Sequence, residues 1–255
     1  MNMTFRLGTT SYILADDILP NAHYLAEKVQ DIELVLFEVD DGQNNLPSPA
    51  DILKLREIAA ESDLTFTVHL PLDLKMGSTG QNLHRSLQKA QSVILRTRPL
   101  DPFAYVLHLD GKEVEDYGDW VEQASRSLEI AADWAGDPAL LAVENLENYP
   151  LDFIDPVLER VPVSRCLDVG HLWLEGHDPV PFLQRHLSRT KVVHIHGVGT
   201  RDHQSLAHIE ESKLQAVLAC LEGFEGVFTL EIFNRADLES SIDALRKAGM
   251  QWQPN

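Results

Sequence analysis

Eight short runs of β-branched and apolar residues recur along the chain, separated by segments with helical hydrophobic spacing. The segments between the runs, such as SPADILKLREIAAES and GDWVEQASRSLEIAADWAG, repeat apolar residues every three or four positions, and several end in glycine. Because this spacing places the apolar residues on one face of a helix, the pattern predicts strands that alternate with helices. The runs begin at Phe5, Asp31, Leu64, Phe103, Ala139, Ser164, Lys191 and Gly226.

Strands that alternate with helices pair in parallel through right-handed crossovers. Eight such units in 255 residues favour a closed (β/α)8 barrel over an open doubly wound sheet. No GxGxxG motif follows the first run, which argues further against a dinucleotide-binding sheet. No linker, low-complexity tract or internal repeat divides the sequence. We therefore predict an α/β fold in which residues 1–255 form a single TIM-barrel domain.

The charge of the chain bears on its partners. Forty acidic residues against 21 Lys and Arg give a net charge of −19, which is the wrong balance for binding the phosphate backbone of nucleic acid. We expect a small-molecule substrate, with neither nucleic acid nor a membrane as partner. The sequence has only two cysteines, no apolar run long enough to cross a bilayer and no basic leader followed by an apolar run, so we expect a cytoplasmic protein.

Ionisable side chains stand near the carboxyl ends of the predicted strands from the second strand onward. A single histidine at a strand end is more often structural, but independent structural roles at so many strands would be a coincidence. The strand ends of a barrel converge at one mouth, where buried polar groups must pair or bind cations. Imidazole and carboxylate together are ligands for zinc, manganese, iron or cobalt. The residues of this predicted metal site are His69, His108, Glu144, Asp168, His171, His194, His196, His203 and Glu231.

Other residues near the predicted mouth are candidates for substrate contacts. Tyr12, in the TTSY segment after the first strand, either lines the mouth or belongs to a polar loop. Trp173 either walls a pocket or is ordinary packing, and Cys166 is expected to be a small core residue. No GxSxG elbow, P-loop or Cys–His pattern supports covalent acyl transfer. The predicted substrate-binding residues are Tyr12, Glu38, Trp173 and Arg201.

The order of the candidate ligands resembles that of the xylose-isomerase-like TIM barrels, and in particular their apurinic-endonuclease-like branch. VHLP and VLHL resemble the segments with the branch's first two histidine ligands, VENL its bridging glutamate, LDVGH its Asp-x-x-His motif and LEIF its final glutamate. In HIHGV we align His196 with the family ligand and keep His194 as its neighbour on the same strand face. His203 resembles the histidine of the family's Asp-x-His pair.

There is one departure from the family pattern. The residue two positions before His203 is Arg201, where the three-metal endonucleases carry an aspartate ligand, and Asp202 is adjacent but out of register. The resemblance therefore implies a divalent metal, zinc or manganese, with one or two ions more readily than three.

Within that superfamily, the segments FRLGTTSYI, FTVHLPLDL and LDVGHLW resemble the cobamide-remodelling phosphodiesterases. This resemblance implies hydrolysis of the phosphodiester in the nucleotide loop of a cobamide such as adenosylcobalamin. The products would be cobinamide phosphate and the lower-ligand nucleoside, for corrinoid salvage and remodelling. It also implies catalytic roles for Glu144, which would bridge ions, and for His171 and Glu231, which with Asp168 would complete the second centre. The residues expected to serve the first centre or to contact phosphate are His69, His108 and His203.

The main alternative is a sugar isomerase or epimerase of the same superfamily, which would hold one divalent metal. Its expected ligands are Glu144, Asp168, His196 and Glu231. An isomerase would not need the additional histidines at positions 69, 108 and 203 as ligands, and this feature separates the two hypotheses. DNA repair is disfavoured by the net charge and by Arg201. A non-enzymatic corrinoid-binding module would have no need for so many metal ligands.

Overall fold

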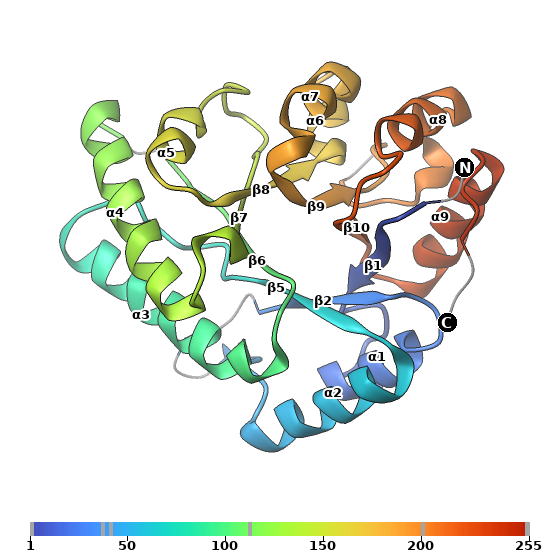
Figure 1. Ribbon diagram of the computed structural model, residues 1–255, viewed down its shortest axis with the longest axis horizontal. Coiled ribbons are helices and arrows are strands. Elements are labelled where there is room, and N and C mark those ends of the chain that lie inside the picture. The colour runs from blue at the N-terminus through green and yellow to red at the C-terminus, as the bar shows by residue number, and fades with distance from the viewer. Residues whose placement is uncertain (1–2, 37–38, 41–42, 112–113, 200–201, 253–255) are drawn as a thin grey trace.

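Eight parallel strands close into a barrel in the computed structural model, which describes residues 3–36, 39–40, 43–111, 114–199 and 202–252 (Figure 1). The strands follow the order β1-β10-β9-β8-β7-β6-β5-β2, and β2 closes the barrel against β1. This arrangement confirms the predicted (β/α)8 fold. The strands are β1 (Arg6–Thr10), β2 (Asp31–Val35), β5 (Thr65–His69), β6 (Ala104–Leu107), β7 (Leu141–Glu144), β8 (Ser164–Asp168), β9 (Thr190–Ile195) and β10 (Val227–Leu230).

Helices surround the strands on the outside of the barrel (Figure 1). No helix in the described ranges is both long and apolar enough to cross a membrane. The α-helices are α1 (Ile18–Leu25), α2 (Pro49–Ser62), α3 (Gly80–Thr97), α4 (Tyr117–Ala135), α5 (Asp155–Arg160), α6 (Val169–Leu174), α7 (Pro179–His186), α8 (Glu211–Cys220) and α9 (Arg235–Lys247). The short 3-10 turns are η1 (Arg98–Leu100), η2 (Pro138–Leu140), η3 (Leu187–Arg189) and η4 (Leu206–His208).

The long helices begin and end where local side chains satisfy their free backbone groups. At the start of α2 the Ser48 hydroxyl accepts a hydrogen bond from the Asp51 amide, while the Asp51 carboxylate accepts one from the Ser48 amide. At the end of α4, Gly136 takes a left-handed conformation with φ 96°. The helices α1, α5, α6 and α7 have only six to eight residues, so about two turns are too few to reveal their periodicity in the sequence.

The second strand is shorter than the sequence suggests. The run that begins at Asp31 continues to Val39, but β2 ends at Val35. The Asn45 amide donates a hydrogen bond of 3.0 Å to the Val35 carbonyl, and the Ser11 hydroxyl accepts one of 3.1 Å from the Val35 amide. Side chains thus satisfy the amide and carbonyl of Val35, which still pairs with His69 of β5. A two-stranded hairpin of β3 (Val39–Asp40) and β4 (Gln43–Asn44) follows.

Two apolar layers build the core. The larger one lies between the strands and the helices, where residues such as Leu34, Val143 and Leu230 are fully buried. A separate small cluster contains Cys166 together with Ala104, Val106, Ala142 and Val192. Parallel pairing places Cys166 beside Val192 and Glu144, which share its face of the sheet. The expectation that Cys166 is a core residue is therefore confirmed.

Candidate metal centre

The candidate metal ligands lie at or near the carboxyl ends of the strands, which meet at one mouth of the barrel. Glu144 and Asp168 are the last residues of β7 and β8, and Glu231 directly follows β10. Parallel register sets Asp168 beside His194 and Glu144 beside Cys166. Because neighbouring residues in a parallel ladder project to the same side, the side chains at these ends converge. Three groups of imidazole and carboxylate donors result, and together they contain all nine residues predicted to bind metal.

The first group consists of His69, His108 and Glu144. The Nε2 atoms of His69 and His108 lie 3.3 and 3.0 Å from Oε2 of Glu144. The His69 Nδ1–H donates a hydrogen bond of 2.8 Å to the Leu70 carbonyl, which orients Nε2 towards Glu144. His69 and Glu144 are almost completely buried, and the His108 side chain is 18% exposed. The group therefore presents two imidazole nitrogens and one carboxylate at the rim.

The second group consists of Glu144, Asp168, His194 and Glu231, all of them buried. Nδ1 of His194 lies 3.5 Å from Oε2 of Glu231 and 3.7 Å from Oε1 of Glu144. Glu144 thus belongs to the first and second groups at once, with one oxygen facing each. A carboxylate in that position is able to bridge two cations.

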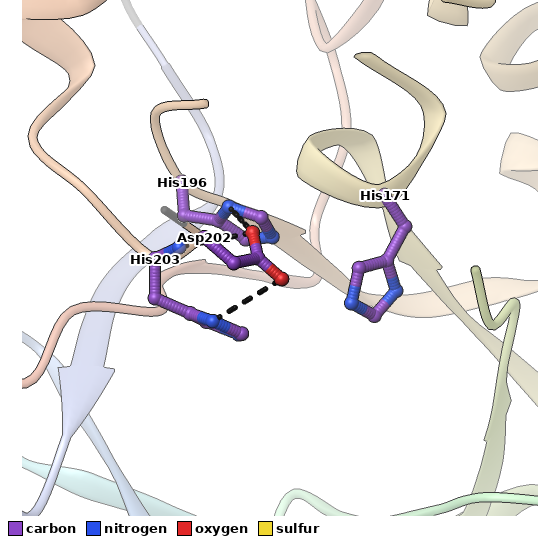
Figure 2. A group of neighbouring side chains, drawn as sticks. All are labelled: His171, His196, Asp202 and His203. Carbon is purple, nitrogen blue, oxygen red and sulfur yellow. Dashed lines mark hydrogen bonds and ion pairs between the residues drawn. The ribbon is translucent and has the colours of Figure 1, made fainter. Parts of the chain in front are cut away.

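The third group consists of His171, His196, Asp202 and His203. Figure 2 shows the Asp202 carboxylate beside the rings of His196 and His203, in contact with each, and His171 opposite on its own helix. Asp202 Oδ1 lies 3.1 Å from His196 Nδ1, and Oδ2 lies 3.4 Å from His203 Nδ1. The rings of His196 and His203 stack with centroids 4.4 Å apart.

Asp202 corrects the sequence-based expectation that its carboxylate is out of register with the ligands, since it lies in one group with His196 and His203. His203 has a φ of 51°, and its amide donates a hydrogen bond of 2.9 Å to Asp202 Oδ1. The left-handed turn brings the carboxylate of the directly preceding residue beside the imidazoles. Arg201 itself lies outside the described residues. The adjacency of Asp202 and His203 was the signal available, but the local turn could not be foreseen from spacing.

The Asp-x-x-His spacing has a structural cause. Asp168 caps helix α6, since its Oδ1 accepts a hydrogen bond of 2.7 Å from the His171 amide. The Asn145 side chain bonds to both the amide and the carbonyl of Asp168, at 2.9 and 3.0 Å, and the Asn145 carbonyl accepts from His171 Nδ1 at 3.0 Å. Asn145, which sequence reasoning missed, therefore fixes both Asp168 and His171. Asn145 directly follows Glu144 in the VENL segment, and no sequence pattern identifies it as a residue that orients the metal-binding candidates.

Charges at the site stabilise one another. Burial opposes ionisation of Glu144, but the imidazoles of His108 and His194 hold the pKa of its carboxyl well below the ordinary value. Burial likewise disfavours the charged form of His171, yet the carboxylates of Asp168 and Glu144 raise its pKa to about 10. Against burial, Asp168 raises the pKa of His196 to about 9. Cations that bind here would displace such protons.

Several buried polar atoms of the site lack a hydrogen-bond partner among the described residues. They are Oδ2 of Asp168, Nδ1 of His194, Nε2 of His196 and Oε2 of Glu231. A buried polar atom without a partner costs about 1–3 kcal/mol, so four in one place indicate an absent binding partner. Imidazole nitrogen and carboxylate oxygen are the donor set of zinc and manganese sites. The residues therefore fit the predicted divalent metal.

The scan against protein families matches residues 27–252 to the family described as the xylose isomerase-like TIM barrel. The chain belongs to this family. A search of curated protein sequences finds no match. The family membership confirms the coarser part of the sequence-based identification.

Solved structures of the xylose isomerase-like fold superpose along almost the whole chain. A D-tagatose 3-epimerase-like protein has a TM-score of 0.76 at 19% identity, covering 96% of this chain and 97% of its own. Endonuclease IV from Thermus thermophilus has a TM-score of 0.74 at 19% identity, covering 95% and 98%. The E. coli 3-keto-D-glucoside 4-epimerase has a TM-score of 0.68 at 16% identity, covering 96% and 98%. At these identities the likeness establishes the fold.

Of the four predicted substrate-binding residues, the structure describes Tyr12 and Trp173. The Tyr12 hydroxyl accepts a hydrogen bond of 2.8 Å from the Asn45 amide, in the loop that follows β1. Trp173, on α6, packs partly against the core and lines a hollow with His177 and Lys213. Glu38 and Arg201 fall outside the described residues. A role of these four residues in substrate binding stays a prediction.

Proposed function

We propose that the protein is a metal-dependent phosphodiesterase. The observation that carries this proposal is the position of Glu144, whose two oxygens face different groups of nitrogen and oxygen donors. Oε2 lies 3.0 Å from His108 Nε2, while Oε1 lies 3.7 Å from His194 Nδ1. Two adjacent cation sites that share a carboxylate suit phosphoryl transfer, because attacking and departing oxygens both need charge stabilisation.

The residues of the site have distinct parts in this reaction. Divalent cations would neutralise the phosphodiester and activate water. His69, His108 and Glu144 would hold the first cation, and Glu144, Asp168, His194 and Glu231 the second. His171 and His203 border the same rim, where an imidazole is able to contact a phosphoryl oxygen or pass a proton to the leaving group. Their partners Asn145 and Asp202 keep the two rings in place.

We propose further that the substrate is a cobamide such as adenosylcobalamin. The support is the resemblance of the first, third and sixth strand segments to the cobamide-remodelling phosphodiesterases, together with the net charge of −19. An acidic protein disfavours a long polyanion such as DNA and tolerates a compact substrate with a single phosphodiester. Hydrolysis of the nucleotide loop would release cobinamide phosphate and the lower-ligand nucleoside, in keeping with corrinoid salvage by a cytoplasmic enzyme.

One observation favours a second candidate, a sugar isomerase or epimerase with a single metal. The second group, with His194 in place of the expected His196, alone offers four donor atoms within 4.8 Å of one another, which is a complete coordination set. Two of the superposed structures are named as an epimerase or an epimerase-like protein. The first and third groups, with His69, His108 and His203, have no role in that chemistry, so we place the isomerase second.

The test combines metal-loaded protein with adenosylcobalamin and separates the products by chromatography. The proposal predicts cobinamide phosphate and at least two metal equivalents per chain. The His108→Ala variant should lose the activity, whereas His84→Ala, an exposed position on α3, should retain it. Turnover of a ketose with a single bound metal and no cobinamide phosphate would reject the phosphodiesterase in favour of the isomerase. Cleavage of a simple phosphodiester such as bis-p-nitrophenyl phosphate, but not of a cobamide, would keep the reaction and reject the substrate.

A further inference from the structure

Glu33 and His194 form a fully buried pair across the inside of the barrel. Glu33 lies on β2 and His194 on β9, and strands β1 and β10 separate these two strands in the sheet. The His194 Nε2 atom lies 2.8 Å from Oε2 of Glu33, and both side chains are 0% exposed. Burial of a charged side chain costs several kcal/mol in desolvation free energy unless a partner compensates for it. For Glu33 that partner is His194.

The other ring nitrogen of His194 faces the carboxylates of the second group. Its Nδ1 lies 3.5 Å from Glu231 Oε2 and 3.9 Å from Asp168 Oδ2. These distances are too long for hydrogen bonds, and each of the three atoms lacks a hydrogen-bond partner among the described residues. By contrast, ligands arranged tetrahedrally about 2.1 Å from a zinc ion lie about 3.4 Å from one another. The spacing is therefore that of atoms around a shared cation.

We propose that Glu33 is the positioning residue of the second group: it holds the ring of His194, already one of the predicted metal ligands, so that Nδ1 faces Asp168 and Glu231. Glu33 accepts the Nε2 proton, so Nδ1 presents its lone pair to the carboxylates. A carboxylate behind a metal-bound imidazole fixes both the tautomer and the ring orientation. This inference rests on the metal-dependent part of the proposed function, but not on its substrate.

His196, the other histidine of this strand segment, belongs to a different group from His194. His196, two residues along, has Nε2 3.3 Å from Asp168 Oδ1 and Nδ1 3.1 Å from Asp202 Oδ1, so its ring lies in the third group. This corrects the alignment of His196 with the family ligand: His194, the first histidine of HIHGV, supplies the nitrogen that faces Glu144 and Glu231. Glu33 is bonded to this ring at the nitrogen that points away from those carboxylates.

The experiment measures metal binding without turnover. Chelator competition with Zn²⁺ and metal analysis are carried out on wild type, Glu33→Gln, Glu33→Leu and the control Asp31→Asn. Asp31 is also a buried carboxylate of β2, but it bonds to Thr65 instead of a histidine. We expect affinity at the second group to fall about 10–100-fold in Glu33→Leu, less in Glu33→Gln, and to be unchanged in Asp31→Asn. Folded Glu33 variants with wild-type affinity would overturn the inference.

A second measurement uses the wild-type protein, in case the variants do not fold. Crystals soaked with Zn²⁺ or Mn²⁺ are examined by anomalous diffraction at the metal edge. The inference predicts an ion within bonding distance of His194 Nδ1, with the Nε2–Glu33 contact retained. An ion bound by Glu144, Asp168 and Glu231 but out of reach of His194 would refute it. Neither measurement uses a cobamide, so a failed phosphodiesterase assay leaves this result unaffected.

Discussion

Gly170 lies against the ring of His196 with no room for a side chain. A Cβ atom on Gly170 would lie 2.1 Å from Nε2 of His196. Gly170 is the second residue of helix α6, one residue before His171. Because Gly170 has no side chain, helix α6, which follows β8, can lie against His196, which follows β9, at the mouth of the barrel. The contact bears on the second and third groups, since His196 lies 3.3 Å from Asp168 Oδ1 and 3.1 Å from Asp202 Oδ1.

Gly170→Ala should destabilise the protein, although alanine is the better helix former. The added methyl group must displace the His196 ring, and such overpacking costs about 1–3 kcal/mol in the free energy of unfolding. Metal content should fall along with stability. Denaturant unfolding and metal analysis check both effects. Gly118→Ala on α4, where a Cβ would approach the N-capping Asp116 carboxylate at 3.2 Å instead of a buried ring, is the comparison and should lose less stability than Gly170→Ala.

Glu144→Ala should abolish turnover while the barrel stays folded. Glu144 connects the first and second groups, so its loss removes a donor from each of two cation sites. We expect the rate to fall more than about a hundredfold, because even support residues of metal sites cost about 10–100-fold. Activity, metal content and circular dichroism are measured together. Wild-type activity in this variant would mean that the site has been misassigned.

Asp202→Asn should weaken the binding of any cation that the third group takes up in addition to the two cations of the proposed site. The carboxylate faces His196 and His203, and an amide in its place removes the negative charge that favours a cation. We expect about a tenfold or greater loss of affinity for the weakest cation bound. Asp243→Asn, at an exposed position on α9, is the matched control. Identical binding isotherms for the two variants would show that Asp202 is not a ligand.

Ionisation of Asp31 should lower the free energy of unfolding as the pH rises through the mildly acidic range. Burial, opposed by a hydrogen bond from Thr65, raises the pKa of Asp31 from 3.8 to about 6. The folded state therefore binds a proton more tightly than the unfolded chain, so this contribution is present below about pH 4 and lost as the pH passes about 6. The shift corresponds to at most about 3 kcal/mol.

The measurement is the free energy of unfolding of wild type and Asp31→Asn from about pH 4 to about pH 7. Asparagine does not titrate, so the variant should gain on wild type by up to about 3 kcal/mol over this range. Taking the difference removes the contributions of the other titrating groups. A difference that does not change with pH would show that Asp31 is not perturbed by its burial.

Much of the protein was determined by local sequence. Hydrophobic periodicity predicted the strands, the long helices and the barrel, because each element must bury one face wherever it lies. The identities of the metal-binding candidates followed as well, since polar residues at the ends of buried strands, such as His69 and Glu144, have few alternatives to a shared site. The length of β2 did not follow, because the Asn45 side chain that takes the Val35 carbonyl arrives from outside the strand.

Only the tertiary structure decided how the donors are grouped. Glu33 and His194 are 161 residues apart in sequence, and their contact depends on the register of β2 and β9 around a closed barrel. Asp202 joins the third group in place of the expected position because of one left-handed residue, His203. The positions of residues along the sequence indicate which side chains lie at the mouth of the barrel. Distances across the mouth depend on strand register and loop conformation, which long-range pairing sets.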